Sequence, residues 1–226
     1  MSRYILINII ILSIPLLLSF DRRVRYYRKL HLTGFSILII SSLFILWDII
    51  ASGRGDWYFN SQFISSFSFL HLPLGEWMFF FTVPYSCLFL YETYRTYIPE
   101  RRIHINPLIF YILALISIVS GIMLIGKVYT STVLLVTGFV FILNTLCFRD
   151  LTEDLRYWIY IASTMVLFII FNYFLTSMPI VMYNSNAITG FRFLTIPLED
   201  FLYNYSLLTL YAGIFLITGK RWARTE

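Results

Sequence analysis

Two long uncharged apolar runs follow each other near the middle of the chain. LIFYILALISIVSGIMLIG (108–126) and TSTVLLVTGFVFILNTLCF (130–148) contain no Asp, Glu, Lys or Arg. Each approaches the ~20 residues that a helix needs to cross a bilayer. The whole chain is also 59% hydrophobic, more than an ordinary soluble domain. We therefore expect an all-α integral membrane protein.

The hydropathy of the rest of the chain predicts a multi-pass protein with seven transmembrane helices. Thirteen of the 17 Lys and Arg residues would then lie in one set of connections. The positive-inside rule places this set in the cytoplasm, so the N-terminus is expected outside and the C-terminus in the cytoplasm. The expected spans are roughly 4–20, 32–51, 73–94, 107–126, 130–148, 157–178 and 196–218.

The chain has a formal net charge of +5. Because the topology explains where the basic residues lie, this charge does not indicate a nucleic-acid partner. We expect the chain to lie in the cytoplasmic membrane of a bacterium, in contact with membrane lipid. Its oligomeric state stays open.

No motif indicates a metal or a nucleotide cofactor. Cys87 and Cys147 fall inside predicted spans, where cysteine usually serves as a small packing residue. The three histidines have no metal-ligand spacing, and the chain contains no G-x-G-x-x-G, P-loop or H-E-x-x-H sequence. We expect no metal and no cofactor.

Two outer loops repeat at a shift of 124 residues. NSQFISSFSFLHLPL (60–74) aligns without a gap with NSNAITGFRFLTIPL (184–198), and eight of the fifteen positions are identical. The same shift places Trp47-Asp48 over Phe171-Asn172 and Glu76 over Asp200. Because the same register holds through a loop and into both flanking helices, we infer an internal repeat.

The repeat divides one membrane domain, 1–226, into three parts. We expect a first three-helix unit at 1–100, a linker helix at 101–128 and a second three-helix unit at 129–226. Because the linker adds a single crossing, the two units run parallel, related by an axis near the membrane normal. A ligand is expected in a cavity between them.

Acidic side chains open the last span of each unit. Pro73 and Pro197 suit the first turn of a helix, which places Glu76, Glu199 and Asp200 in that turn. An acid within a membrane usually faces the bundle interior and marks function. Because neighbours on a helix point about 100° apart, we expect only one of Glu199 and Asp200 to face the cavity.

Asp48 and its repeat mate Asn172 end the second and sixth spans on the same side. With Glu76 and Asp200, they could bring polar groups from four helices to one depth. Such groups could hydrogen-bond to one another for structure, or they could serve chemistry. A protonated acid in an apolar pocket is a competent proton donor.

Aromatic side chains crowd the outer half of the first unit. They could form an interfacial belt, or a pocket whose ring faces stabilise a positive charge. The candidate substrate-binding residues are Trp47, Trp57, Trp77, Phe80, Asn172 and Asn184.

Over essentially its whole length, the chain resembles the small integral-membrane lycopene (carotenoid) cyclases, which are built from two three-span units. Their Pro-x-Glu-Glu/Asp signature is intact in the second copy, whereas Gly75 stands in place of the first acid in the first copy. The stretches that carry the resemblance are FDRR (20–23), WD (47–48), WYFN (57–60), PLGEWMFFFTVPY (73–85) and IPLEDFLYN (196–204).

The resemblance implies a cofactor-free isomerisation of a carotenoid such as lycopene. An acid protonates the terminal double bond, the cation closes a six-membered ring, and loss of a proton restores neutrality. Glu199 or Glu76 would be the donor, and Glu76, Asp200 or Asp48 the acceptor. An extended C40 polyene is about as long as the ~30 Å hydrocarbon core, so its end would reach these acids. We expect a lycopene β-cyclase.

Two other classes of protein stay open: a small-solute transporter with three spans, a linker and three spans, and a non-catalytic carotenoid-binding protein. The transporters would be expected to carry Pro-Gln pairs in their spans, and this chain has none. A retinal protein is excluded because the last span has no lysine before Lys220, at its cytoplasmic end.

Overall fold

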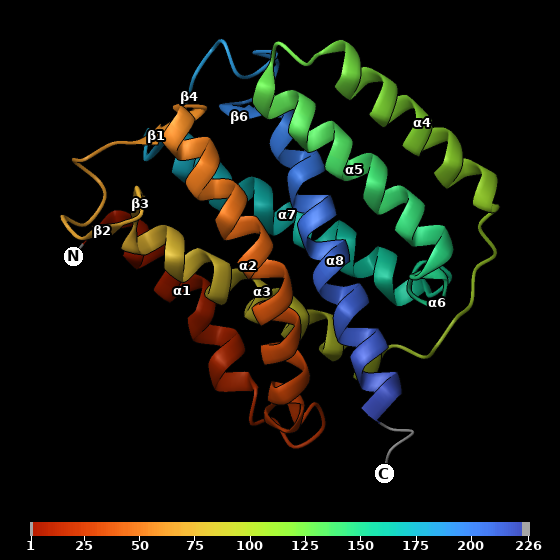
Figure 1. Ribbon diagram of the computed structural model, residues 1–226. Coiled ribbons are helices and arrows are strands. Elements are labelled where there is room, and N and C mark those ends of the chain that lie inside the picture. The colour runs from red at the N-terminus through yellow and green to blue at the C-terminus, as the bar shows by residue number, and fades with distance from the viewer. Residues whose placement is uncertain (1, 223–226) are drawn as a thin grey trace.

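The computed structural model describes residues 2–222, and in it each of the seven expected segments is helical (Figure 1). A 3-10 helix and a short α-helix lie in the connections: η1 (Tyr26–Lys29) and α6 (Arg149–Thr152). The long helices are α1 (Arg3–Leu18), α2 (Leu30–Arg54), α3 (Leu74–Tyr97), α4 (Pro107–Met123), α5 (Val128–Leu146), α7 (Leu155–Ser177) and α8 (Leu198–Trp222).

Within the described residues, four of these helices are long and apolar enough to cross a membrane: α2 together with η1, α5, α7 and α8. Helices α1 and α4 are apolar but shorter. Large hydrophobic side chains cover the outside; Met123 of α4, for example, is 79% exposed. An exterior of this kind suits lipid rather than water, so the chain is a membrane protein.

Six short strands depart from the all-helical prediction. They form three antiparallel two-stranded ribbons in the outer loops. Strands of two or three residues are too short to show a periodicity in the sequence, which is why the prediction missed them. The ribbons are β1 (Trp57–Phe59) with β4 (Val181–Tyr183), β2 (Ser68–Phe69) with β3 (Leu72–Pro73), and β5 (Arg192–Phe193) with β6 (Ile196–Pro197).

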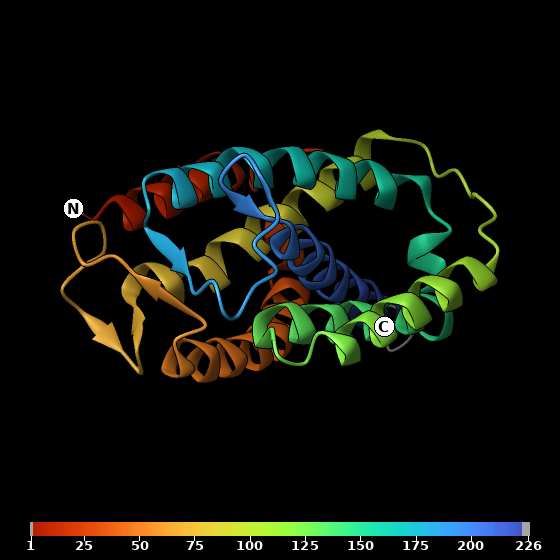
Figure 2. The ribbon, with the colours of Figure 1, turned by 90° about the horizontal axis from the view of Figure 1, so that it is seen from above.

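The β1–β4 ribbon shows how the two copies of the repeat are related. Its central pair joins Tyr58 to Met182, which lies 124 residues later, and the pairs on either side are symmetric about it. A two-fold axis through this central pair therefore exchanges the copies; Figure 2 looks down on this end of the molecule. Helix packing obeys the same symmetry, because α2 packs on α8 as α7 packs on α3, and α1 packs on α3 as α5 packs on α8.

A matching hairpin precedes the acidic turn in each copy. The turns place Leu70, His71 and Leu194 at positive φ (50°, 66° and 56°), which residues other than glycine rarely adopt. Leu70 and Leu194 correspond under the shift of 124. Since the last residue of each hairpin is the proline that directly precedes α3 or α8, the hairpins determine where the first-turn acids lie.

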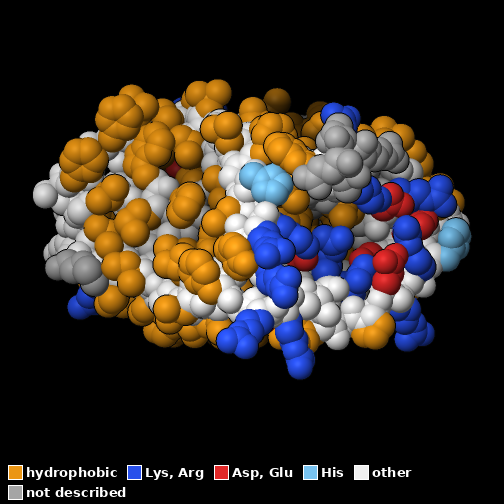
Figure 3. All heavy atoms as spheres, turned by 90° about the horizontal axis from the view of Figure 1, so that it is seen from below, with side chains coloured by type: hydrophobic (Ala, Val, Ile, Leu, Met, Phe, Trp, Pro, Cys, Tyr) orange, Lys and Arg blue, Asp and Glu red, His pale blue; other side chains and the backbone are white. Residues whose placement is uncertain are grey.

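Most basic side chains lie at the end of the molecule opposite the strands (Figure 3). There Lys29 and Arg95 both pair with the buried Glu92, which fastens η1 to α3. Lys220 pairs with Asp150, which ties the end of α8 to α6. In each copy, these ion pairs thus fasten the connection between helices to the last helix of that copy.

Candidate active site

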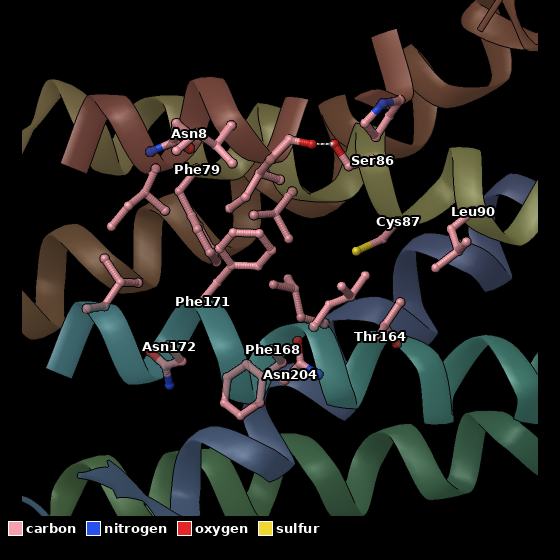
Figure 4. Close-up of a pocket in the computed structure, with 18 of the residues that line it drawn as sticks. Asn8, Phe79, Ser86, Cys87, Leu90, Thr164, Phe168, Phe171, Asn172 and Asn204 are labelled. Carbon is pink, nitrogen blue, oxygen red and sulfur yellow. Dashed lines mark hydrogen bonds between the residues drawn. The ribbon is translucent and has the colours of Figure 1, made fainter. Parts of the chain in front are cut away.

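A cavity of about 640 Å³ lies between α1, α3 and α7 and reaches the strand-side ends of α2 and α8. Its lining on α3 runs from Glu76 to Tyr97, which at 1.5 Å per residue is about 31 Å. Figure 4 shows Phe79 of α3 and Phe171 of α7 in the space between these helices. The cavity is therefore long, mostly apolar and of a size typical of ligand sites.

Asp48 and Glu76 lie together at the strand end of this cavity. Glu76 accepts a hydrogen bond from the Tyr4 hydroxyl of α1, at 2.5 Å. Asp48 is 4% exposed, and neither of its carboxylate oxygens accepts a hydrogen bond within 3.5 Å from the described residues. Glu76 and the Trp57 indole are among its polar neighbours. The first copy thus contributes two neighbouring acids, of which Asp48 is buried and Glu76 is half-buried.

Asp200 of α8 lines the same end of the cavity, and its surroundings are different. The hydroxyls of Tyr129 and Tyr183 donate to its two oxygens at 2.6 and 2.7 Å. The amide of Asn172 donates to it at 3.1 Å. Three donors around one buried carboxyl group are an arrangement that stabilises the carboxylate.

Glu199, although adjacent to Asp200, does not line the cavity. It accepts hydrogen bonds from the Thr130 hydroxyl (2.5 Å) and from the backbone and hydroxyl of Thr189 (2.8 and 2.7 Å). The expectation that only one of the two acids faces the cavity is confirmed, and that acid is Asp200. Glu199 instead fastens the outer loop of the second copy to α5 and α8.

We expect Glu199→Gln to keep most of the turnover of the protein while lowering its stability. An amide oxygen can still accept from Thr130, but the charge-assisted bonds to Thr189 weaken, at a cost of about 1–3 kcal/mol in the free energy of unfolding. Thermal unfolding of the purified variant and product formation measure the two effects. Near-complete loss of turnover at wild-type stability would show instead that Glu199 takes part in the reaction.

Of the predicted substrate-binding residues, Trp47, Trp57 and Asn172 line the cavity. The other three do not. The Trp77 indole donates to the Phe69 carbonyl at 3.2 Å, and the Asn184 amide donates to the Gly55 carbonyl at 3.0 Å. Phe80 is 2% exposed within the helix core. Trp77 thus stabilises the hairpin, Asn184 stabilises the outer loop, and Phe80 packs between helices.

Sequence reasoning missed the tyrosines that hold the acids. Tyr4 and Tyr129 occupy corresponding first turns of α1 and α5, but they are 125 residues apart, one more than the repeat, so an ungapped shift does not align them. The shift of 124 relates Tyr183 to Phe59, which has no hydroxyl, so only the second copy has a hydrogen-bond donor at this position. Among residues 2–222, no group of three or more His, Cys, Asp or Glu side chains could hold a metal ion.

The glycine that interrupts the first copy of the acidic motif has a physical reason. A Cβ atom at Gly75 would lie 2.6 Å from the ring of Tyr4. The ring that donates to Glu76 thus packs where the second copy carries the side chain of Glu199. The two copies of the motif are therefore not equivalent.

We expect Gly75→Ala to lower the free energy of unfolding by about 1–3 kcal/mol, because overpacking forces the Tyr4 ring to move. Displacement of Tyr4 would also weaken its hydrogen bond to Glu76. Gly34→Ala is the matched control, since nothing lies within 4 Å of a Cβ there and alanine favours a helix. Equal unfolding temperatures for Gly75→Ala and wild type would contradict this packing.

Comparison with known proteins agrees with the two-fold organisation. A family model described as lycopene cyclase matches residues 2–94 and again residues 126–218, so one match falls on each copy. Searches of curated proteins and of solved structures found no match. The two matches cover most of the chain and begin 124 residues apart, as the internal repeat does. The chain belongs to the lycopene cyclase family, with two fused cyclase units, and is thus a membrane enzyme of carotenoid cyclisation.

Proposed function

We propose that the protein is a cofactor-independent lycopene β-cyclase whose seven long helices cross the cytoplasmic membrane of a bacterium. The N-terminus would face outward and the C-terminus the cytoplasm, because the basic loops gather at the end away from the strands. The two cyclase units would comprise residues 1–100 and 129–226, with 101–128 as the linker.

The observation that carries the proposal is the meeting of Asp48, Glu76 and Asp200 at one end of a long apolar cavity. Such a cavity fits a polyene, and its acidic end gives a reacting double bond a proton donor and a proton acceptor. Acids so deep in an apolar helical bundle are costly, which favours a role in function.

We assign the donor role to Asp48. Asp48 is buried and accepts no hydrogen bond within 3.5 Å from the described residues, which disfavours its charged form, and the adjacent Glu76 disfavours a second negative charge. The O–H of Asp48 is then free to protonate the terminal double bond of the substrate. The π electrons of that bond form the new C–H bond and leave a tertiary cation.

The cation is then consumed without any outside reactant. The π electrons of the neighbouring double bond form the ring-closing C–C bond, which moves the positive charge onto the ring. Asp200, held as a carboxylate by Tyr129, Tyr183 and Asn172, removes the proton from the ring carbon that joins the polyene. The electrons of that C–H bond become the double bond of a β-ring. Proton transfer from Asp200 back to Asp48 completes the cycle.

Aromatic rings beside the acids can stabilise the intermediate cation. Trp47 and Tyr203 line this end, with ring centroids 5.3 Å apart, and Trp57 packs on Tyr129 at 5.2 Å. The face of an aromatic ring attracts a cation through its quadrupole. Their role would therefore be to lower the energy of the charged intermediate after Asp48 has given up its proton.

The test is turnover by the purified chain in liposomes that contain lycopene and no nucleotide, flavin or added metal. We expect β-ring products, identified by chromatography and absorption spectra. Product that appears only after addition of a nucleotide or flavin would contradict the cofactor-independent mechanism. Bound but unchanged lycopene would favour a carotenoid-binding protein.

A further inference from the structure

The two-fold axis predicts two equivalent grooves. The α3 groove lies along α3 between α1 and α7, and the α8 groove lies along α8 between α5 and α2. Both begin at the acids near the axis. The chain, however, is open along only one of them.

The lining of the cavity shows this asymmetry. Along α3 it continues to Tyr97 at the far end of the helix, whereas along α8 it stops at Leu207. Farther along α8, the described residues enclose a pocket of only about 60 Å³, between α8, α6 and the end of α5. The cavity therefore follows α3 and not α8.

Side chains at positions related by the repeat explain why the α3 groove is open and the α8 groove is closed. Cys87 and Thr164 line the α3 groove, and the shift of 124 relates them to Tyr211 and Ile40. Both larger side chains are buried, and the Tyr211 hydroxyl is hydrogen-bonded to Ser41 at 2.7 Å. A tyrosine and an isoleucine thus fill in the α8 groove the space that a cysteine and a threonine leave free in the α3 groove.

A further side chain fills the α8 groove closer to the end of the molecule where most basic side chains lie. Val24 lines the α3 groove, and its mate in the second copy is the buried Phe148. The Phe148 ring packs directly against α8, within 2.5 Å of where a Cβ at Gly213 would be. Gly213 corresponds to Phe89 of the first copy. In the second copy, α8 therefore has no side chain at this position, and the Phe148 ring occupies the space.

The α3 groove also has a mouth that faces outward. Ile10 and Ile14 of α1 and Leu167 of α7 line the cavity and are 51%, 65% and 42% exposed. Helices α1 and α7 both pack on α3 rather than closely on each other. In a bilayer, this mouth would open onto the hydrocarbon core, where a carotenoid is dissolved.

We propose that each chain binds one carotenoid, which enters sideways from the bilayer between α1 and α7 and lies along the α3 groove, while the α8 groove is closed. The polyene would place one end at the acids and the other near Tyr97, about 31 Å away. The site rests on the proposed function only for the chemistry at the acids. A product with two rings would require the molecule to leave, turn end for end and bind again.

Cys87→Tyr tests the proposal, because it puts into the α3 groove the residue that fills the α8 groove. We expect carotenoid that copurifies with the chain to fall at least about tenfold, with wild-type thermal stability, and product formation to fall with it. Tyr211→Phe is the matched control, since it keeps the ring in the α8 groove, and it should bind carotenoid as wild type does. Thr164→Ile is the milder variant should Cys87→Tyr not fold.

The stoichiometry of bound carotenoid on the wild-type chain is a second readout that needs no variant. One carotenoid per chain is expected, and two would overturn the proposal. Wild-type binding by a folded Cys87→Tyr or Thr164→Ile chain would overturn it as well. If the wild-type chain binds one carotenoid but forms no ring, and Cys87→Tyr abolishes that binding, the groove stands and the proposed cyclase chemistry fails.

Discussion

Asp48→Asn is expected to reduce ring formation by about 100- to 10,000-fold, the usual contribution of a positioned general acid. An amide cannot give up a proton to an alkene, whatever its position. The fold should tolerate the change, because the matched position of the other copy, Asn172, already holds an asparagine. Initial rates of ring formation at equal protein concentration, together with the thermal unfolding temperature, measure both effects.

Glu76→Gln separates the two acids of the first copy. If Asp48 is the donor, the glutamine should impair the reaction less than Asp48→Asn does, because the Tyr4 hydroxyl can still donate to an amide oxygen. An inactive Glu76→Gln beside an active Asp48→Asn would reverse the assignment. Carotenoid bound to each purified variant shows whether lost turnover comes from chemistry or from lost binding.

Asp200→Asn is expected to reduce turnover at least about 100-fold, as for loss of a general base. The variant should still bind lycopene, since the apolar length of the groove is unchanged. Any residual product should contain a different proportion of ring isomers, because the cation must lose its proton to another acceptor. Chromatography of the products resolves these isomers.

Glu199→Gln is the control for this variant, because it changes the neighbouring acid outside the cavity. Equal losses of turnover in both variants would point to damage to the first turn of α8. A fully active Asp200→Asn would remove Asp200 from the reaction.

The helices and the repeat could be predicted from the sequence because each rests on a pattern that is local or is repeated in register. Uncharged apolar runs predicted the helical segments, and the loop at 60–74 with its copy at 184–198 predicted the two units. The shift of 124 also aligned Glu76 with Asp200, both of which line the cavity.

The partners of the acids could not be predicted, since they depend on packing between distant segments. Tyr4 reaches Glu76 across 72 residues, and Tyr129 reaches Asp200 across 71. The choice between Glu199 and Asp200 depends on the rotation of α8, which the motif alone does not determine. Aromatic composition likewise could not separate Trp47 and Trp57, in the cavity, from Trp77, which packs against its hairpin.

The difference between the two grooves was also hidden, although its residues are all visible in the sequence. Cys87 and Tyr211 are an ordinary difference between diverged copies until the structure shows that Cys87 lines a cavity, whereas Tyr211 is fully buried. In our proposal, side-chain size decides which groove is open, so packing adds an asymmetry to that of the acidic motif.

The most direct test of the central claim is pigment analysis of lycopene-producing cells that express this chain or its Asp48→Asn variant. We predict β-carotene, or the one-ringed γ-carotene, from the wild-type chain, and unchanged lycopene from a variant present in the membrane at the same level. Unchanged lycopene from correctly inserted wild-type protein would contradict the assignment of the chain as a lycopene cyclase. Full conversion by the variant would contradict the assigned proton donor.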